Sequence, residues 1–534
     1  MAALPVSKNS DGPADVDNKG EVDLVDDSAH ELGASIVEPH PETISQALTR
    51  HPWTLLWLIY GIWVVMCCSF DNSAGSSVLS IPKFREDFGY LYEGDYVLPA
   101  AWQSAFSGGP AASQIVGTFV GGVLGDKIGR KWMVLITYLV LFVGVTVEVI
   151  ANDTSSPSAV FFAGKVINGL GIGALLTTVM TYISEISPVS LRGIFAAAAA
   201  IAFCIGTLVL SLVVNAYGDL PSAWAYKSAF VTQYGVTGIA LLVWPFMPES
   251  PTWLVAQGKE ERAVHASKRL GLSPQETEIS LATISFTIER AKQETAGASY
   301  GELFRRSNLR RTIIAFMPLT IQAFSGVYWV AGYFTYYAQL AGFSTAMSYK
   351  LNIVQQVLST LGNITSVQNL GRRGMNLWGL VALTVILFIA GGTATLGTIE
   401  GNKATVGFIL VYCWLYNATI GATGYIAMSE IGTTRLRNKT AAFSLAMQGA
   451  WGTMWSFVLP YLFNPNEANL QAKVSFIFGG FSLLCCIYFY LYHPETKGRT
   501  FAELDEMFAK HVPARKFASY KVGEDAEGDR VSGV

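Results

Sequence analysis

Charged residues are scarce in this sequence of 534 residues. Asp, Glu, Lys and Arg together make up only 14% of it, whereas they make up about 25% of a typical soluble domain. The 36 basic residues almost balance the 39 acidic ones, so the basic excess of a nucleic-acid-binding protein is missing. The six cysteines all lie within apolar stretches, which argues against a disulfide framework and a zinc site. A soluble enzyme and a small secreted domain are therefore excluded.

What the chain has instead is apolar sequence. Hydrophobic residues make up 51%, and there are 51 Gly, 30 Phe and 13 Trp. Both Gly and interfacial aromatic residues are enriched in membrane helices. Twelve apolar segments each approach the ~20 residues that a helix needs to cross a bilayer. We expect these spans at 54–80, 98–124, 132–150, 158–184, 191–214, 229–248, 311–338, 346–369, 375–397, 404–430, 438–463 and 472–492.

The spans divide the chain into five regions. Residues 1–52 are polar and acidic and are predicted to form a disordered cytoplasmic tail. An N-terminal six-helix bundle over 53–248 and a C-terminal one over 311–492 flank a charged cytoplasmic linker, 249–310. The charge pattern of the linker predicts short amphipathic helices on the membrane surface. Residues 493–534 form a cytoplasmic C-terminal tail.

The distribution of Lys and Arg predicts the orientation. If both termini are cytoplasmic, the inner connections and the C-terminal tail hold 26 basic residues and the outer connections hold six, as the positive-inside rule requires. Asn152 then begins an outer sequon, Asn152-Asp153-Thr154, and is a candidate for glycosylation.

Two motif pairs recur at matching places in the two halves. GDKIGRK (125–131) follows span two and NLGRRG (369–374) follows span eight; SEISPVSLRG (184–193) follows span four and SEIGTTRLRNK (429–439) follows span ten. Such duplication predicts two pseudo-symmetric six-helix bundles related by an axis along the membrane normal, the arrangement of major facilitator transporters. The predicted fold class is thus an all-α membrane protein with twelve transmembrane helices.

The sequence resembles the sugar porter branch of the major facilitator superfamily, and within it the fungal α-glucoside and disaccharide permeases. The motifs that carry the resemblance are SFD (69–71), FREDFG (84–89), GDKIGRK, YISEISPVSLRG, PESPTWL (248–254), IQAFSG (321–326) and PETKGRT (494–500). The resemblance implies alternating access of two bundles around a central substrate site, usually driven by proton symport.

Asp71 and Lys165 are the candidates for proton coupling. An acid within an apolar helix costs at least ~2.5–3.5 kcal/mol unless it faces a cavity or a partner. The resembled family carries an arginine where this chain has Lys165, and lysine loses its proton more readily when buried. We expect protonation of Asp71 to release Lys165. The alternatives are that Asp71 lies at a helix end near the headgroups and that Lys165 reaches the surface.

Charged residues at the inner helix ends are implied by the resemblance to form an interdomain salt-bridge network that closes the inner gate. These are Asp126, Arg130, Glu185, Arg192, Arg372, Arg373, Glu430 and Arg437. The Glu-to-Arg spacing of seven recurs in both halves. Ordinary positive-inside charge is the alternative.

A sugar site needs amides and aromatic faces in an apolar channel, because sugar hydroxyls must exchange water for hydrogen bonds. The candidates are Gln322, Gln355 or Gln356, Tyr328, Tyr425 and Gln448, with Gln103 and Trp102 extending the pocket. Where the resembled family carries further amides, this chain has Ala323 and Ala200. These absences favour a glycoside or a less hydroxylated ligand over a free hexose. Interhelical hydrogen bonding is the alternative role of each amide.

The sequence thus predicts a monomeric carrier in the plasma membrane, with a sugar or glycoside and a proton as its ligands and no cofactor. The alternatives are a carrier or exporter of a polyol or secondary metabolite, and a nutrient sensor that does not transport. An enzyme is not expected, because the sequence shows no nucleophile with a base, no metal-ligand cluster and no phosphate-binding glycine loop.

Overall fold

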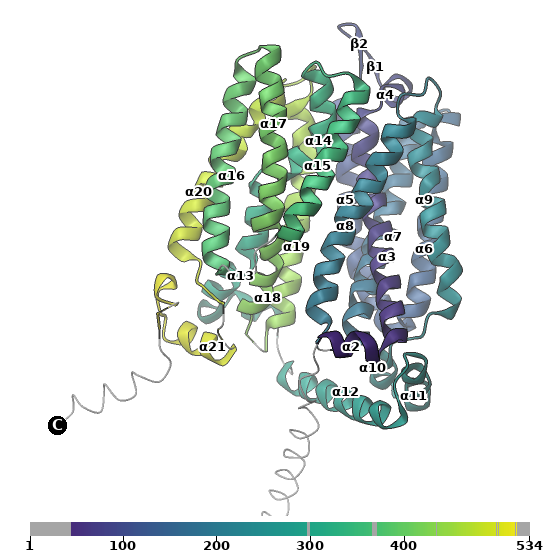
Figure 1. Ribbon diagram of the computed structural model, residues 1–534, viewed down its shortest axis with the longest axis vertical. Helices are drawn as coiled ribbons and strands as arrows, with labels where there is room; N and C mark the ends of the chain where they lie inside the picture. The colour runs from purple at the N-terminus through teal and green to yellow at the C-terminus, as the bar shows by residue number, and fades with distance from the viewer. Residues whose placement is uncertain are drawn as a thin grey trace, which may run out of the picture.

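The computed structural model describes residues 44–188, 190–295, 299–365, 371–433, 435–497, 499, 501–517 and 519–520. All twelve predicted spans are helical over most of the residues that the structure describes. The N-terminal half contains α3 (Pro52–Ser77), α5 (Ala100–Ile128), α6 (Arg130–Ile150), α7 (Pro157–Ile186), α8 (Arg192–Tyr217) and α9 (Trp224–Val243). These helices and those of the C-terminal half run side by side along the long axis of the molecule (Figure 1).

The C-terminal half repeats this arrangement with two interrupted spans. It contains α13 (Arg306–Phe324), α14 (Val327–Leu340), α15 (Thr345–Thr365), α16 (Arg372–Thr395), α17 (Ile399–Tyr416), α18 (Ala422–Ile431), α19 (Arg437–Phe463) and α20 (Val474–Tyr492). Span seven is divided between α13 and α14 at Gly326, whose φ of 104° favours glycine. Span ten is divided between α17 and α18 by a π-helical turn, η5 (Asn417–Gly421), a feature frequent at functional sites.

Each half has its own apolar interior. One cluster of buried side chains, centred on Trp329, Tyr412 and Trp455, belongs to the C-terminal half, and another, centred on Tyr138 and Tyr182, belongs to the N-terminal half. The halves meet where α5 packs against α19 and α8 packs against α15. Of the helical segments in the described residues, nine are long and apolar enough to cross a membrane. The three predicted spans that do not meet this criterion, α5, α15 and α19, all lie at the junction of the halves.

Glycine allows α5 and α7 to approach closely. A Cβ atom on Gly117 would lie 2.2 Å from the carbonyl oxygen of Leu170, and one on Gly173 would lie 2.1 Å from that of Gln114. Small residues at such positions let membrane helices pack backbone to backbone. Because α7 carries Lys165, this glycine contact fixes the depth and rotation of the predicted coupling residue.

One end of the molecule carries the linker and both ends of the described chain, and is called the linker end here (Figure 1). The linker forms α10 (Pro251–Ala256), α11 (Glu260–Arg269), α12 (Pro274–Thr295) and the 3-10 turn η4 (Tyr300–Phe304). The prediction that residues 1–52 are disordered is wrong for residues 44–50. These form α2 (Ile44–Arg50), in which Ala47 is fully buried and Arg50 pairs with Glu276 of α12.

The C-terminal tail is also partly folded. It forms α21 (Phe501–Ala509) and η7 (Ala514–Lys516). Leu504 and Met507 of α21 are buried against Ile314 of α13. Their spacing of three places them on one face of the helix, so α21 packs against the C-terminal bundle.

The opposite end, called the hairpin end, carries elements that the sequence did not predict. They are α4 (Pro82–Phe88) and a two-stranded hairpin of β1 (Tyr90–Tyr92) and β2 (Asp95–Val97), with Tyr90 paired to Val97. Glu93 and Gly94 turn the hairpin with positive φ values of 50° and 96°. The remaining short turns are η1 (Val78–Ser80), η2 (Ala151–Asp153), η3 (Trp244–Phe246) and η6 (Gln471–Lys473).

Candidate functional site

Asp71 and Lys165 are both buried within the N-terminal half. Asp71 of α3 is 6% exposed and Lys165 of α7 is 3% exposed. This excludes the alternatives in which Asp71 lies at an exposed helix end and Lys165 reaches the surface. The ammonium group of Lys165 also lies 4.9 Å from the ring centre of Phe230 and 5.6 Å from that of Phe161, which adds cation–π stabilisation.

The ion-pair partner of Lys165, however, is Glu148 of α6. The Nζ atom of Lys165 lies 3.0 Å from Oε2 of Glu148, whose side chain is fully buried. Asp71 was predicted from the sequence and Glu148 was not, although Glu148 lies inside the predicted span 132–150 and is subject to the same burial cost. Its position near the end of that span concealed it, because acids there usually reach the headgroups.

Two buried amides join the carboxylates. Nδ2 of Asn168 donates to Oδ1 of Asp71 at 2.8 Å and to Oε1 of Glu148 at 2.9 Å. Nε2 of Gln233, on α9, donates to the same Asp71 oxygen at 2.9 Å. The cluster therefore draws one side chain each from α3, α6 and α9 and two from α7, a combination that no local sequence pattern specifies.

Close helix packing holds this cluster together. A Cβ atom on Gly164 would lie 2.8 Å from Cγ of Glu148, and one on Gly144 would lie 3.1 Å from Oδ1 of Asn168. Any side chain at either position would push α6 and α7 apart. The two glycines are thus the positions at which the sequence permits Glu148 and Asn168 to meet.

The predicted sugar-binding amides form a hydrogen-bonded chain in the C-terminal half. The Tyr425 hydroxyl donates to Gln448 at 3.1 Å, and Nε2 of Gln448 donates to Oε1 of Gln322 at 3.0 Å. Gln322 in turn donates to the carbonyl of Ile420, at the π-helical turn, at 2.8 Å. The structure therefore brings together three of the predicted residues from α13, α18 and α19.

Tyr328 joins this group from α14. A Cβ atom on Gly452 would lie 2.5 Å from the Tyr328 hydroxyl, so this hydroxyl lies against α19 one turn after Gln448. A Cβ atom on Gly449, the residue that follows Gln448, would lie 3.0 Å from Ile115 of α5. The chain of polar groups is consequently next to the junction between the two halves.

Gln355 and Gln356 face different surroundings. Oε1 of Gln356 accepts from the hydroxyl of Thr207 on α8 at 3.0 Å, across the junction of the halves. Gln355 is buried and donates to the carbonyl of Val330 and to Cys413, inside the C-terminal half. The structure thus favours Gln356 over Gln355 as the site residue of span eight.

The alanines at the two substituted positions also differ in their surroundings. Ala323 belongs to the apolar interior of the C-terminal half, and Ala200 is exposed. On α8, the hydroxyls of Thr207 and Ser211 face α15, because they contact Gln356 and Asn352 respectively. These hydroxyls were not predicted from the sequence, since serine and threonine in a membrane helix usually bond to their own backbone.

Gln103 and Trp102 are placed near the hairpin end, where the two halves touch. Nε2 of Gln103 donates to the carbonyl of Leu98 at 3.0 Å, and Asn464 of the C-terminal half donates to the same carbonyl at 3.2 Å. Trp102 packs on Phe106 with ring centres 5.7 Å apart. Gln103 therefore belongs to the contacts that close the hairpin end and not to the amide chain around Gln322.

Further contacts seal the hairpin end. Nη2 of Arg85 donates to Gln339 at 2.9 Å, and Gln339 donates to the carbonyl of Ser80 at 2.7 Å. The Ser104 hydroxyl donates to the carbonyl of Phe457 at 2.8 Å. The N-terminal and C-terminal halves are therefore bridged at this end in the conformation described.

The predicted gate residues at the linker end make ion pairs within one half. Arg130 lies 2.7 Å from Glu185 and 3.0 Å from Asp126, and all three belong to the N-terminal half. Arg192 contacts the carbonyl of Ser187 at 3.4 Å, and Arg373 donates to that of Tyr490 at 2.8 Å. These contacts differ from the interdomain network that the sequence analysis predicted. The side chains of Arg372 and Glu430 lie outside the described residues, and Arg437 begins α19.

Two further acids at this end were not singled out from the sequence. Glu249 accepts from the backbone N–H groups of Arg130 and Lys131 at 2.8 and 3.2 Å, and Glu495 accepts from that of Arg373 at 3.0 Å. They cap the first turns of α6 and α16, where an anion is stabilised. Burial raises the pKa of Glu249, against the effect of the backbone hydrogen bonds. Their common signal was a Pro-Glu pair, at the end of span six and just after span twelve.

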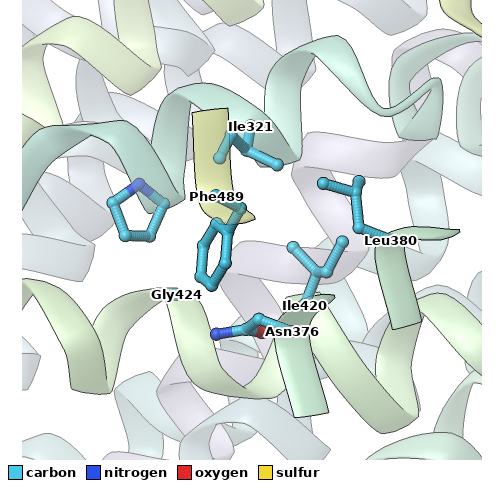
Figure 2. Close-up of a pocket in the computed structure, with 7 residues that line it drawn as sticks. Ile321, Asn376, Leu380, Ile420, Gly424 and Phe489 are labelled. Atoms are coloured by element: carbon cyan, nitrogen blue, oxygen red, sulfur yellow. The ribbon is translucent and has the colours of Figure 1, made fainter. Parts of the chain in front are cut away.

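A small cavity lies within the C-terminal half (Figure 2). It is lined by Pro318, Ile321, Asn376, Leu380, Ile420, Gly424 and Phe489. Ligand pockets usually carry several converging polar groups, whereas Asn376 is the one amide side chain in this lining. The cavity is therefore a packing space behind Gln322 and not the sugar site.

Asn152, the predicted glycosylation residue, is part of η2 at the hairpin end and is half-buried. The six cysteines, all within the described residues, are free thiols. Among the described residues no group of three or more His, Cys, Asp or Glu side chains is placed to hold a metal ion.

Comparison with known proteins identifies the family. The sequence model of the family described as sugar (and other) transporter matches residues 66–508. The general alpha-glucoside permease of Saccharomyces cerevisiae is 28% identical over 542 aligned positions, covering 97% of this chain and 85% of the permease. The MFS transporter fmqE of Aspergillus fumigatus is 29% identical, covering 91% of this chain and 93% of the relative.

Solved structures confirm the predicted fold. The partially occluded, inward-open form of the xylose transporter XylE from E. coli superposes with a TM-score of 0.69 at 17% identity, over 84% of this chain and all of that one. The twelve-helix major facilitator fold in two six-helix bundles is therefore correct. The matched relatives are permeases and transporters, and the chain is not an enzyme. From residue 66 to residue 508, this chain belongs to the sugar transporter family of the major facilitator superfamily.

Proposed function

We propose that this chain is a proton-coupled symporter of a sugar or glycoside that works by alternating access. The observation that carries the proposal is the buried position of Asp71 on α3, where it accepts hydrogen bonds from Asn168 and Gln233. A carboxyl group in such surroundings gains or loses a proton at a high cost in solvation. That cost makes its protonation state a natural control on which conformation the carrier adopts.

The proton gradient supplies enough free energy for accumulation. One proton moving down ~100 mV releases ~2.3 kcal/mol, and a difference of one pH unit adds ~1.36 kcal/mol. A one-to-one symporter therefore sustains a gradient of roughly 500-fold at equilibrium.

The amide chain supports a hydroxylated substrate. Gln322, Gln448 and Tyr425 offer donors and acceptors next to the junction of the halves, and Tyr328 places its hydroxyl beside them, against Gly452. Aromatic faces and amides together suit the apolar and hydroxylated surfaces of a pyranose ring. Gln356 and Thr207 add a polar pair from the opposite wall of the junction.

Glycosides are favoured over free hexoses by two lines of support. Alanine occupies two positions at which the resembled family carries amides, and one relative is described as a general alpha-glucoside permease. A second candidate, carriage or export of a polyol or secondary metabolite, is favoured by the likeness to the transporter fmqE.

The proposed orientation places both termini and the linker in the cytoplasm of a plasma-membrane monomer. Alternating access then requires the contacts at the hairpin end, such as Arg85 to Gln339, to break when the outside opens. The inner contacts of Arg130 remain within the N-terminal half, so they would move with it as a rigid body. Asn152 would face the outside and accept a glycan.

Uptake measurements test this proposal. The chain is expressed in a yeast strain that lacks its own glycoside transporters, and radiolabelled maltose, cellobiose and lactose are supplied at two external pH values, with and without an uncoupler. We expect accumulation that is larger at acidic pH and abolished by the uncoupler. Accumulation of none of the glycosides would contradict symport and favour the metabolite carrier.

A further inference from the structure

Glu148 is a buried acid for which the Asp71–Lys165 coupling hypothesis has no role. It is 1% exposed, its Oε2 lies 3.0 Å from the ammonium of Lys165, and its Oε1 accepts from Asn168 at 2.9 Å. The same nitrogen of Asn168 donates to Asp71 at 2.8 Å. Two carboxyl groups on different helices thus share one amide group, and one of the two, Glu148, also pairs with Lys165.

The charges of this cluster do not balance without a proton. Two carboxylates and one ammonium leave one negative charge in the protein interior, where an uncompensated charge is strongly disfavoured. The other charged groups on the helices of the cluster lie at the two ends of the molecule. Lys227 pairs with Asp153 at 3.0 Å near the hairpin end, whereas Arg130 pairs with Glu185 at 2.7 Å and Lys131 donates to the carbonyl of Pro245 at the linker end. The free thiols of Cys67 and Cys68 on α3 carry no charge at pH 7. One bound proton restores neutrality.

The contacts indicate which acid holds that proton in this conformation. Lys165 is paired with Glu148, which is therefore the ionised acid. Asp71 receives two amide donors on its Oδ1 atom. A protonated carboxyl group keeps one oxygen that accepts such donors while the other oxygen carries the proton.

Lys165 is also close to α3. Gly75 follows Asp71 by one helical turn, and a Cβ atom on Gly75 would lie 3.5 Å from Cε of Lys165. The absence of a side chain at Gly75 lets the lysine lie along α3. A rotation of its last bonds can therefore turn the ammonium from Glu148 toward Asp71.

We propose that Glu148 and Asp71 together form a two-carboxylate site that holds one proton, with Lys165 as their shared counter-ion. Glu148 keeps Lys165 charged and in place while Asp71 carries the proton. When the Asp71 O–H group releases its proton to water, the new carboxylate draws Lys165 toward α3. The inference rests on the proposed proton coupling, and it assigns Glu148 as a positioning residue that sets the pH at which Asp71 loads.

An infrared pH titration of the purified full-length chain tests the proton count. The carboxyl C=O band reports protonated buried acids, and charge balance predicts their number at neutral pH. We expect one such group in the unmodified chain, none in Glu148→Gln or Asp71→Asn, because one acid then balances Lys165, and two in Lys165→Gln. Glu400→Gln, which removes an exposed acid at the hairpin end, should leave the count at one, and Glu148→Asp should retain it.

The result that overturns the inference is a Glu148→Gln chain that keeps one protonated acid with an unchanged titration midpoint. If that variant does not purify as a monodisperse protein, Lys165→Gln decides: two protonated acids support the shared site, and one overturns it. This readout needs no substrate. Failure of the unmodified chain to accumulate any glycoside would therefore contradict symport while the infrared count still decided the role of Glu148.

Transport of the glycoside that the unmodified chain accumulates gives the second readout. In Glu148→Gln, Lys165 is left to pair with Asp71, so loading should require a lower external pH. We expect the midpoint of the uptake–pH profile to fall by about one unit or more and exchange at saturating substrate to persist. An unchanged profile with ordinary accumulation would overturn the proposal, because a purely structural role for Glu148 would not shift the midpoint.

Discussion

The contact between α5 and α7 provides a sharp test of the structure. In Gly173→Ala the added Cβ would lie 2.1 Å from the carbonyl oxygen of Gln114, whereas real Cβ contacts are rarely closer than 3.0 Å. The helices must therefore separate by about 0.9 Å, since backbone atoms cannot rotate away as a side chain can. Overpacking of this kind costs about 1–3 kcal/mol.

Gly122→Ala is the matched control, because no heavy atom lies within 4 Å of a Cβ at that position of α5. Both substitutions gain about 1 kcal/mol of helix propensity, so the difference between the two variants isolates the overpacking cost. Unfolding by SDS in mixed micelles should give Gly173→Ala a free energy of unfolding about 1–3 kcal/mol below that of Gly122→Ala. Equal free energies, or a more stable Gly173→Ala, would refute the close approach of α5 and α7.

The other predictions concern the transport site and the linker end. Asp71→Asn should lose uphill, pH-driven uptake in proteoliposomes but keep exchange, because the variant can no longer release a proton. Gln448→Leu removes an amide that can make two hydrogen bonds to substrate hydroxyls, worth about 0.5–1.5 kcal/mol each, so the KM for the transported glycoside should rise roughly 5- to 150-fold. Hydrogen bonds from Ser273 and the Arg50 guanidinium lower the pKa of Glu276. This lowered pKa stabilises the contact of α2 with α12 above the unfolded-state pKa of about 4.3, and the stabilisation is lost as pH falls through the folded value. Proteolysis near α2 should therefore increase at acidic pH.

Each of these three predictions has a control and an outcome that would contradict it. Retained uphill uptake in Asp71→Asn would end the coupling assignment. Gln355→Leu changes an amide whose contacts lie within the C-terminal half, so an equal rise of KM in this variant would show that Gln448 acts only through packing. Glu276→Gln should make α2 susceptible to protease already at neutral pH, and a cleavage rate independent of both pH and this substitution would refute the role of the ion pair.

The sequence predicted the fold well because membrane helices leave a strong local signal. About 20 consecutive apolar residues are needed to cross a bilayer, and each of the twelve expected segments is helical over most of its described residues. The tails were predicted less well. The segments that form α2 and α21 are only seven and nine residues long, and they fold because a few of their side chains, such as Ala47 and Met507, are buried against distant elements.

The candidate site was predictable in its residue types but not in its pairings. Gln322, Gln448 and Tyr425 were identified from the sequence, and they do share hydrogen bonds. The choice of Gln356 over Gln355 required the structure, because adjacent residues of a helix point about 100° apart and only the packing shows which one faces α8.

By itself, the sequence determined that this protein is a two-fold repeated membrane carrier with buried charges, since hydropathy, motif spacing and the cost of a buried charge are local properties. Only the tertiary structure decided which charges meet. Lys165 pairs with Glu148 on a neighbouring helix, and Asn168 joins Glu148 to Asp71. The physical reason is the close packing of α6 on α7 at Gly144 and Gly164, because the depth and rotation of packed helices depend on all their contacts at once.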